Sequence, residues 1–163
     1  MIVVMMGVSG SGKTTIGKVL AERLQTVFAD ADAYHSAENK AKMAAGNALN
    51  DADRQPWLES LNALLRAWVE GGRGGVLACS ALKECYRKTL VSGMPSSSVV
   101  FVLLDGSQKL FAERLAHRDD HFMNPILLDS QIATLERPAD ALRIMNDQTP
   151  AEVVDEIMRN VQV

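Results

Sequence analysis

Short apolar runs alternate along the chain with segments whose apolar residues recur at helical spacing. Five runs are predicted as strands: residues 2–6, 26–29, 75–79, 98–104 and 142–145. Periodicity and capping residues predict helices over residues 14–24, 36–45, 51–71, 82–91, 108–117, 128–135 and 150–161. This alternation of strands and helices indicates an α/β fold, with a mostly parallel sheet covered by helices on both faces.

Three of these elements carry further expectations. The helix over residues 51–71 begins at Asp51, which we expect to be its N-cap, and Trp57 is expected to be a packing anchor. The run at residues 98–104 is continuous and β-branched, so we expect a strand buried on both faces. Pro150 suits the first turn of the last helix, because proline is favourable there.

The turn after the first strand matches the phosphate-binding pattern G-x-x-x-x-G-K-[ST] at residues 7–14. Glycines allow positive φ and close approach of the backbone, so successive N–H groups at a helix N-terminus can form an anion nest. The alternative is an ordinary Gly/Ser-rich turn, but the strand before it and the helix after it favour nucleotide binding. The predicted nucleotide-binding residues are Gly7, Val8, Ser9, Gly10, Ser11, Gly12, Lys13, Thr14 and Thr15.

Composition narrows the class of protein further. The chain has 163 residues, 47% hydrophobic and 23% charged, which suits one globular domain over residues 1–163. A net charge of −3 gives no basic field for nucleic acid, so we expect no nucleic-acid partner. No apolar run approaches the ~20 residues of a membrane span and no leader is recognisable, so we expect a cytoplasmic protein without a membrane partner. Cys79 and Cys85 fit no disulfide or metal-ligand spacing.

Ligands of parallel α/β sheets lie beyond the carboxyl ends of the strands, which selects candidate site residues. Asp30 and Asp32 follow the second strand, and both can face the γ-phosphate region if the segment stays extended. Phosphoryl transfer needs one carboxylate to orient the attacking hydroxyl and others to hold Mg²⁺. Asp30 and Asp32 are therefore predicted to serve this chemistry, although two turn-capping aspartates would give the same pattern.

Polar residues farther along supply candidates for the acceptor side. His35 and Asn39 are four residues apart and are predicted to share a helical face toward the substrate. Arg54 is a candidate for carboxylate recognition, since a guanidinium binds carboxylates in a bidentate manner. Lys83 and Arg87 are also four apart, and a shared helix face would present two positive charges to an anion. Exposed helix faces and surface ion pairs remain the alternatives for each.

Arginines also flank a polar segment after the helix at residues 108–117. Arg114, Arg118 and His121 lie where the apolar pattern loosens. Arginine-bearing lids cover bound nucleotide and exclude water in small kinases, so a lid is predicted here. Attraction of arginine to a helix C-terminus is the alternative.

Seven stretches along the chain are distinctive: GVSGSGKTT, FADADAYHSAEN, GNALNDADRQPWL, CSALKECYR, RLAHRDDHFM, LLDSQIATLERP and DQTPAEVV. With them the chain resembles the bacterial-type gluconokinases, small-molecule kinases with a phosphate loop. The pair CSALK-x-x-YR and D-x-DR-x-PWL is far more specific than the loop alone. The resemblance covers almost the whole chain.

The resemblance implies a fold and a reaction. The implied fold is a P-loop kinase with a five-stranded parallel sheet in the order 2-3-1-4-5, flanked by helices. Substrate-binding helices are expected at about residues 33–72 and a lid at about residues 118–137. The implied reaction transfers phosphate from ATP to D-gluconate with Mg²⁺, giving 6-phosphogluconate and ADP. Because members of the resembling family look like homodimers, the resemblance also implies a homodimer.

Roles follow for individual residues if the resemblance holds. Thr14 and Asp30 would hold Mg²⁺, while Asp32 would orient the 6-hydroxyl. Lys13, Arg118 and Lys83 would offset charge on the transferring group. Arg54 and Arg87 would pair with the gluconate carboxylate, with His35 nearby. Arg114 would cover adenine near residues 147–150.

The chain departs from the family pattern D-G-D-x-x-H-P, because Ala31 and Ser36 replace its glycine and proline. We expect altered local geometry and retained chemistry. A shikimate kinase would place a glycine triplet after the third strand, whereas here the glycines at 71, 72, 74 and 75 precede it. A GTP-dependent switch would need N-K-x-D, which residues 39–42 lack. A nucleotide-binding regulator without turnover is disfavoured by the intact Lys13, Thr14 and aspartate pair.

Overall fold

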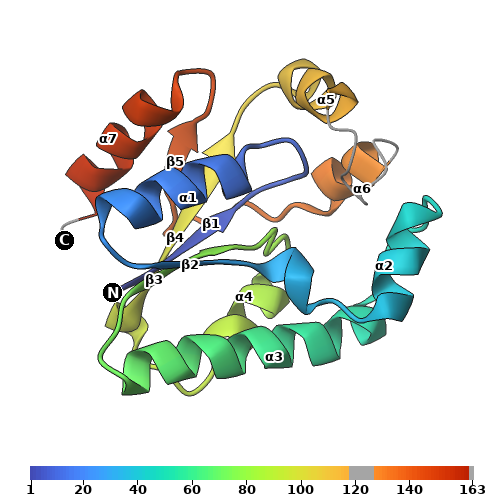
Figure 1. The fold of residues 1–163 in the computed structure, drawn as a ribbon. Coiled ribbons are helices and arrows are strands. Elements are labelled where there is room, and N and C mark those ends of the chain that lie inside the picture. The colour runs from blue at the N-terminus through green and yellow to red at the C-terminus, as the bar shows by residue number, and fades with distance from the viewer. Residues whose placement is uncertain (118–126, 162–163) are drawn as a thin grey trace.

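A five-stranded parallel sheet forms the centre of the protein (Figure 1), which we describe from a computed structural model for residues 1–117 and 127–161. The strands are β1 (Ile2–Met6), β2 (Val27–Asp30), β3 (Gly75–Ala78), β4 (Val99–Asp105) and β5 (Leu142–Met145). Their order is β2-β3-β1-β4-β5, with every neighbouring pair parallel. The predicted fold class and strand order are confirmed.

The helices agree with the sequence prediction to within about two residues at each end. They are α1 (Lys13–Arg23), α2 (Ala37–Ala44), α3 (Asp51–Glu70), α4 (Glu84–Val91), α5 (Gln108–Ala116), α6 (Leu127–Thr134) and α7 (Pro150–Asn160), with 3₁₀ turns η1 (Ala31–Tyr34) and η2 (Ser96–Ser98). Pro150 occupies the first turn of α7, as predicted. No helix within the described ranges is long and apolar enough to cross a membrane.

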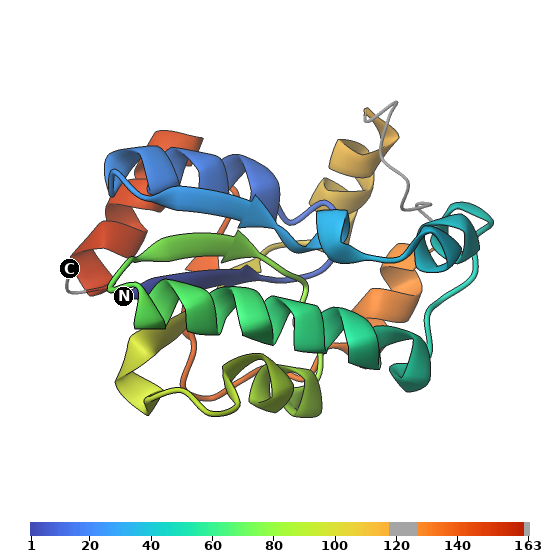
Figure 2. The ribbon, with the colours of Figure 1, turned by 60° about the horizontal axis from the view of Figure 1, so that its bottom comes forward.

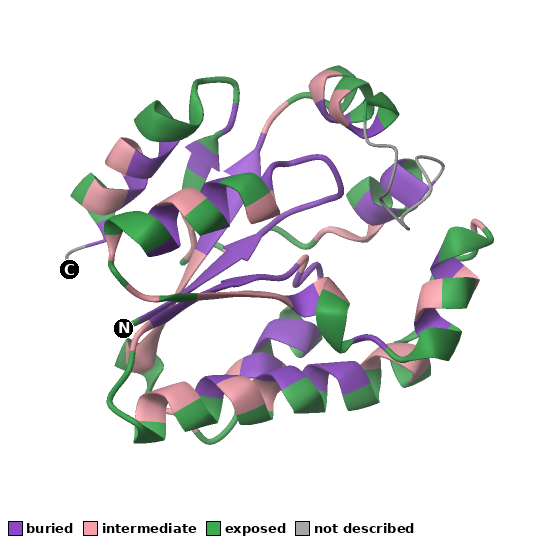
Figure 3. Ribbon diagram, in the orientation of Figure 1, coloured by how far each residue is buried: buried purple, intermediate pink, exposed green. Residues whose placement is uncertain are grey.

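Two hydrophobic layers sandwich the sheet (Figures 2 and 3). α1 and α7 cover one face, and α3 and α4 cover the other. The side chains of β1 alternate between the layers: Val3 and Met5 join the α1/α7 layer, whereas Val4 and Met6 join the α3/α4 layer. All five residues of β1 are buried, which explains why this strand is a continuous apolar run.

Two expectations about these elements are wrong. Burial of β4 on both faces holds only for its last four residues, because residues 99–101 are half-buried, and Phe101 among them borders an open cavity beside α4. The N-cap of α3 is Asn50, not Asp51: the Asn50 side chain accepts from the Asp53 N–H, and the Asp53 carboxylate accepts from the Asn50 N–H. The Asp51 carboxylate is therefore not used for capping and can contact α4.

The carboxyl ends of the strands open toward α2 and α6, which lie beyond that edge of the sheet (Figures 1 and 2). Met43 of α2, Leu49 and Leu127 of α6 form a small buried cluster of their own there. The phosphate loop, η1, the start of α4 and the start of α7 all follow strands at this edge. This edge therefore brings the candidate residues together.

Candidate active site

The phosphate loop between β1 and α1 depends on its glycines. Gly10 and Gly12 have φ of +79° and +96°, in the left-handed region. A Cβ at Gly10 would lie 2.5 Å from the Phe111 carbonyl oxygen, and one at Gly12 would lie 2.2 Å from the Asn146 Nδ2. α1 begins at Lys13 without a side-chain cap, so its first N–H groups are available to an anion. The loop thus has the form of an anion nest.

Lys13 and Thr14 lie at the start of α1 with definite contacts. The Lys13 ammonium donates to the Val8 carbonyl at 3.0 Å, so the side chain lies across the loop. The Thr14 hydroxyl donates to the Asp30 Oδ2 at 2.8 Å, which joins the loop to the end of β2. Thr15 is exposed on the first turn of the helix, whereas Val8, Ser9 and Ser11 are buried.

The segment from Asp30 to Asp32 does not stay extended, so the condition set for this pair is not met beyond Asp30, the last residue of β2. The chain turns into η1 at Ala31, and the Asp30 Oδ1 accepts from the Asp32 N–H at 3.0 Å. Ala31, where the family pattern has glycine, is fully buried, and its carbonyl accepts from the Trp57 indole N–H at 2.7 Å. Ser36, in place of proline, caps α2 by accepting from the Asn39 N–H. Both departures are therefore accommodated locally.

The charges of Lys13, Asp30 and Asp32 all act on the thiol of Cys79, the residue just after β3, and burial raises the pKa of this thiol to about 12. Cys79 is therefore a protonated core residue. The carboxylate and hydroxyl oxygens of Asp30 and Thr14 are the ligand types that Mg²⁺ prefers, and Mg²⁺ commonly uses only one or two protein ligands besides water and phosphate. These residues fit such an ion.

His35 is a packed residue beside the site. Its ring stacks on Trp57 with centroids 4.1 Å apart and planes at 16°, which confirms Trp57 as a packing anchor. His35 precedes the cap of α2, so it shares no helical face with Asn39, although the Asn39 Nδ2 lies 3.4 Å from the His35 Nδ1. Burial, with the nearby charges of Arg54 and Lys40, lowers the pKa of His35 to about 4. The imidazole is therefore neutral at pH 7.

This lowered pKa predicts a loss of stability in acid. The unfolded chain binds a proton at His35 near pH 6.5, whereas the folded chain does so only near pH 4. The free energy of unfolding should therefore fall as pH drops from about 6.5 to about 4, and more steeply than in His35→Gln. Urea unfolding at several pH values measures both slopes. His117→Gln, at an exposed position, should keep the wild-type slope; equal slopes for wild type and His35→Gln would contradict the prediction.

Arg54 and Lys83 come together around Tyr86. The Arg54 guanidinium carbon lies 5.3 Å and the Lys83 ammonium 5.5 Å from the ring centroid. Arg54 also donates to the Tyr86 hydroxyl at 3.1 Å and to the Leu49 carbonyl at 2.6 Å. The two predicted acceptor-side cations are thus neighbours, and together with Tyr86 they connect the first turns of α3 and α4.

Asp51 completes this cluster and was not predicted as a site residue. Its carboxylate accepts from the Tyr86 hydroxyl and from Lys83 at 3.3 Å. These hydrogen bonds lower the pKa of Asp51, and the bond to Asp51 raises the pKa of Lys83. The sequence pattern predicts Asp51 as the cap of α3. Because Asn50 is the cap instead, the Asp51 carboxylate is available to accept from Tyr86 and Lys83.

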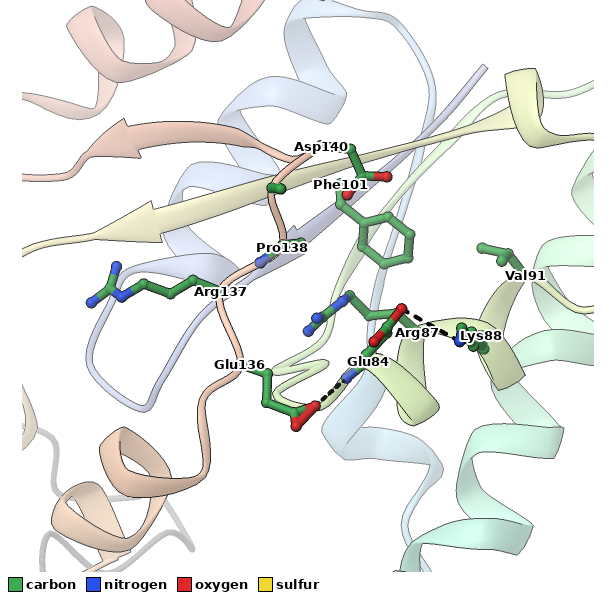
Figure 4. Close-up of a pocket in the computed structure, with 10 residues that line it drawn as sticks. Glu84, Arg87, Lys88, Val91, Phe101, Glu136, Arg137, Pro138 and Asp140 are labelled. Carbon is green, nitrogen blue, oxygen red and sulfur yellow. Dashed lines mark hydrogen bonds and ion pairs between the residues drawn. The ribbon is translucent and has the colours of Figure 1, made fainter.

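Arg87 does not lie with Lys83, so the predicted shared helix face is wrong. Lys83 has extended backbone angles at the N-cap of α4, and only residues after it are helical. Arg87 is buried and donates to the Ala81 carbonyl at 2.7 Å. It lines a cavity of about 600 Å³ between α4, β4 and residues 136–140, where Figure 4 shows it beside Glu136 and Phe101. Burial lowers the pKa of Arg87.

Comparison with known proteins identifies the family. An AAA domain family model matches residues 2–138. The gluconokinase of Gluconobacter oxydans is 44% identical, over 98% of this chain and 90% of that protein. A probable gluconokinase of Dictyostelium discoideum is 48% identical, over 86% of this chain and 72% of that protein. The chain belongs to the gluconokinase family.

Solved structures agree with this membership. A gluconokinase from Sinorhizobium meliloti superposes with a TM-score of 0.84 at 39% identity, covering 96% of this chain and 89% of that one. A sugar kinase from Janibacter sp. gives a TM-score of 0.88 at 43% identity, with coverage of 97% and 92%. A shikimate kinase from Aquifex aeolicus, at 20% identity and a TM-score of 0.63, shares the fold alone.

Arg114 lies behind the phosphate loop of this gluconokinase-family chain. Its Nη2 donates to the Asn146 carbonyl at 2.7 Å. The buried Asn146 side chain in turn donates to the Ser11 carbonyl at 2.6 Å. The position of Asn146 just after β5 places it on the ligand-binding edge in the sequence prediction, but the sequence predicts no contact for it. Arg118, His121 and residues 118–126 of the predicted lid lie outside the described residues.

Gln131 is a second residue that sequence reasoning missed. It lies in α6 and is buried, and its Oε1 accepts from the Ser9 N–H of the phosphate loop at 2.7 Å. Gln131 belongs to the stretch LLDSQIATLERP that resembles the family, but nothing in the local pattern assigns it a contact. The part of the predicted lid that is described, residues 127–137, therefore contacts the loop directly.

Proposed function

We propose that this protein transfers the γ-phosphoryl group of ATP to the 6-hydroxyl of D-gluconate, giving 6-phospho-D-gluconate and ADP. Membership of the gluconokinase family supports the substrates. The observation in the structure that supports the reaction is the hydrogen bond from Thr14 to Asp30, because it joins the end of β2 to the loop that would hold the phosphates.

The phosphate loop would bind the triphosphate through its backbone N–H groups, with Lys13 at the β- and γ-phosphates. Mg²⁺, held by Thr14 and Asp30, would supply neutralisation of phosphate charge. Asp32 would accept a hydrogen bond from the 6-hydroxyl and orient it for in-line attack, taking its proton as the new O–P bond forms. Arg114, with Asn146 behind Ser11, would support the nucleotide side, and Arg118 remains a predicted charge-offsetting group.

Arg54 and Lys83 would recognise the gluconate carboxylate. They are neighbours around Tyr86 at the edge of the sheet where the phosphate loop also lies. This arrangement supports a subsite for an anion at that edge. His35 is neutral and stacked on Trp57, and one of its ring nitrogens would form a hydrogen bond with a hydroxyl group of gluconate. Arg87 stays a prediction that only the family resemblance supports, since its guanidinium lines a different cavity.

One assay of ADP release tests the proposed function. Wild-type protein with ATP and Mg²⁺ is supplied with gluconate, shikimate, other sugar acids or no acceptor. Gluconate should give turnover well above the blank, and no turnover should occur without Mg²⁺. ADP release with shikimate but not gluconate would contradict the assignment, and equal release without acceptor would indicate a plain NTPase.

We also propose a homodimer that works in the cytoplasm. The family resemblance supports the dimer, and the use of ATP as phosphate donor supports a location where ATP is available. Light scattering coupled to gel filtration measures the mass directly. A mass equal to that of one chain across the working concentration range would contradict the dimer.

A further inference from the structure

α6 is anchored at the carboxyl edge of the sheet by contacts to several parts of the molecule. Leu127 packs with Met43 and Leu49 in the small acceptor-side cluster. Leu128 belongs to the main core, which also contains Val8 of the phosphate loop. Just beyond the helix, the Glu136 N–H donates to the Leu82 carbonyl at 2.7 Å. These contacts give α6 a defined position, so a side chain on it can hold a neighbouring group in place.

Gln131 uses that position to hold one peptide unit of the phosphate loop. The Ser9 N–H and the Val8 C=O belong to the same planar peptide group. The N–H donates to the Gln131 Oε1 at 2.7 Å. The C=O accepts from the Lys13 ammonium at 3.0 Å and from the Ser11 N–H at 3.2 Å. Because the unit is planar, an acceptor on its N–H side also fixes the direction of its carbonyl.

Because the hydrogen bond between Ser9 and Gln131 is buried, its loss would be costly. Ser9 is 5% and Gln131 7% exposed, so water has little access to the bond. A buried N–H that loses its acceptor is costly, and the peptide would rotate to find another one. Rotation would turn the Val8 carbonyl away from Lys13. The ammonium would then lose the contact that sets its position across the loop.

We propose that Gln131 is a positioning residue for phosphoryl transfer, which fixes the Val8–Ser9 peptide and through it the Lys13 ammonium. It is not a catalytic residue, because it acts through the loop and Lys13. The inference rests on the proposed kinase function, in which Lys13 neutralises the transferring phosphate. Its structural half, the protection of the Ser9 N–H, stands independently of any activity.

Two substitutions separate the hydrogen bond from packing. Gln131→Met keeps the approximate length and volume of the side chain but removes the amide group, and with it the acceptor oxygen. Gln131→Glu keeps an oxygen that can accept from Ser9. Gln55→Met is the matched control, since Gln55 lies on the exposed side of α3 and pairs only with Glu59 among the described residues. Thermal unfolding and circular dichroism verify that each variant folds.

Gln131→Met should lower kcat for gluconate about 10- to 100-fold, the range expected when a buried donor loses its partner. The dissociation constant for an ATP analogue should change less than about threefold, because Lys13 keeps its charge and the other loop N–H groups still bind phosphate. Gln55→Met should match wild type. Gln131→Glu restores the acceptor but adds a negative charge beside the phosphate loop, so its readout is the exchange of the Ser9 amide and not kcat. Wild-type kcat in Gln131→Met would overturn the proposal.

Amide hydrogen exchange at Ser9, followed by NMR, provides a readout without substrate. Exchange should become at least about 10-fold faster in Gln131→Met and stay slow in Gln131→Glu. Unchanged protection in the Met variant would overturn the proposal even if activity fell. Absence of gluconate turnover in the wild type, with the exchange difference intact, would instead refute the proposed function and the Lys13 role while leaving the hydrogen bond established.

Discussion

Asp32→Asn should reduce kcat for gluconate by about 10²- to 10⁴-fold, the range that a positioned proton acceptor typically contributes. The amide keeps the size of the side chain and its place in η1, but it cannot take the proton of the attacking hydroxyl. Asp32 is outside the phosphate loop and its N–H is held by Asp30, so nucleotide binding should change little. Steady-state kinetics and titration with an ATP analogue measure the two quantities separately.

Asp155→Asn is a suitable control for that substitution. Asp155 is paired with Arg23 at 3.0 Å on the surface formed by α1 and α7, with both side chains about half exposed. Surface pairs contribute little, so both kcat and nucleotide affinity should remain close to wild type. If Asp32→Asn turned over gluconate nearly as well as this control, Asp32 would not be the orienting carboxylate.

Lys13→Ala should lower kcat/KM for ATP by about 10²- to 10³-fold. A decrease of this size is typical when an enzyme loses one preorganised donor to a developing negative charge. Lys13 also contacts the Val8 carbonyl, so removal of its ammonium leaves that carbonyl with the Ser11 N–H. The loss should therefore appear in both nucleotide binding and turnover, unlike that of Asp32→Asn.

Lys18→Ala provides the matched change on the same helix. Lys18 is exposed one turn farther along α1, with its ammonium 6.0 Å from the Phe28 ring centroid. Removal of this cation changes the net charge equally but leaves the loop untouched, and activity should be retained. Equal losses in the two variants would show a general charge effect and no specific role for Lys13.

Much of the fold could be predicted from the sequence because its signals are local. The continuous apolar run of β1 reflects burial on both faces, and the glycines of the loop reflect left-handed backbone. The cap of α3 is harder to predict, since Asn50 and Asp51 are both good N-cap residues and only the reciprocal bonds of Asn50 with Asp53 decide between them. The 3₁₀ turn after Asp30 likewise has no periodic signal in four residues.

The candidate site was harder to predict, because its decisive contacts are long-range. Gln131 is 122 positions from Ser9, and Asn146 is 135 positions from Ser11. No spacing rule relates residues so far apart, so neither contact can be predicted, even though both segments resemble the family. Arg87 shows the converse error: i,i+4 spacing from Lys83 predicts a shared face only where both residues are helical, and Lys83 is not.

The two cysteines differ in a way that gives the protein a single natural site for chemical labelling. Cys79 is buried, and its thiol, with a pKa of about 12, supplies almost no thiolate at neutral pH. Cys85 is exposed in the first turn of α4, next to Tyr86. A maleimide dye should therefore attach there alone and report on the Arg54–Tyr86 surroundings, so acceptor binding becomes visible by fluorescence without any engineered cysteine.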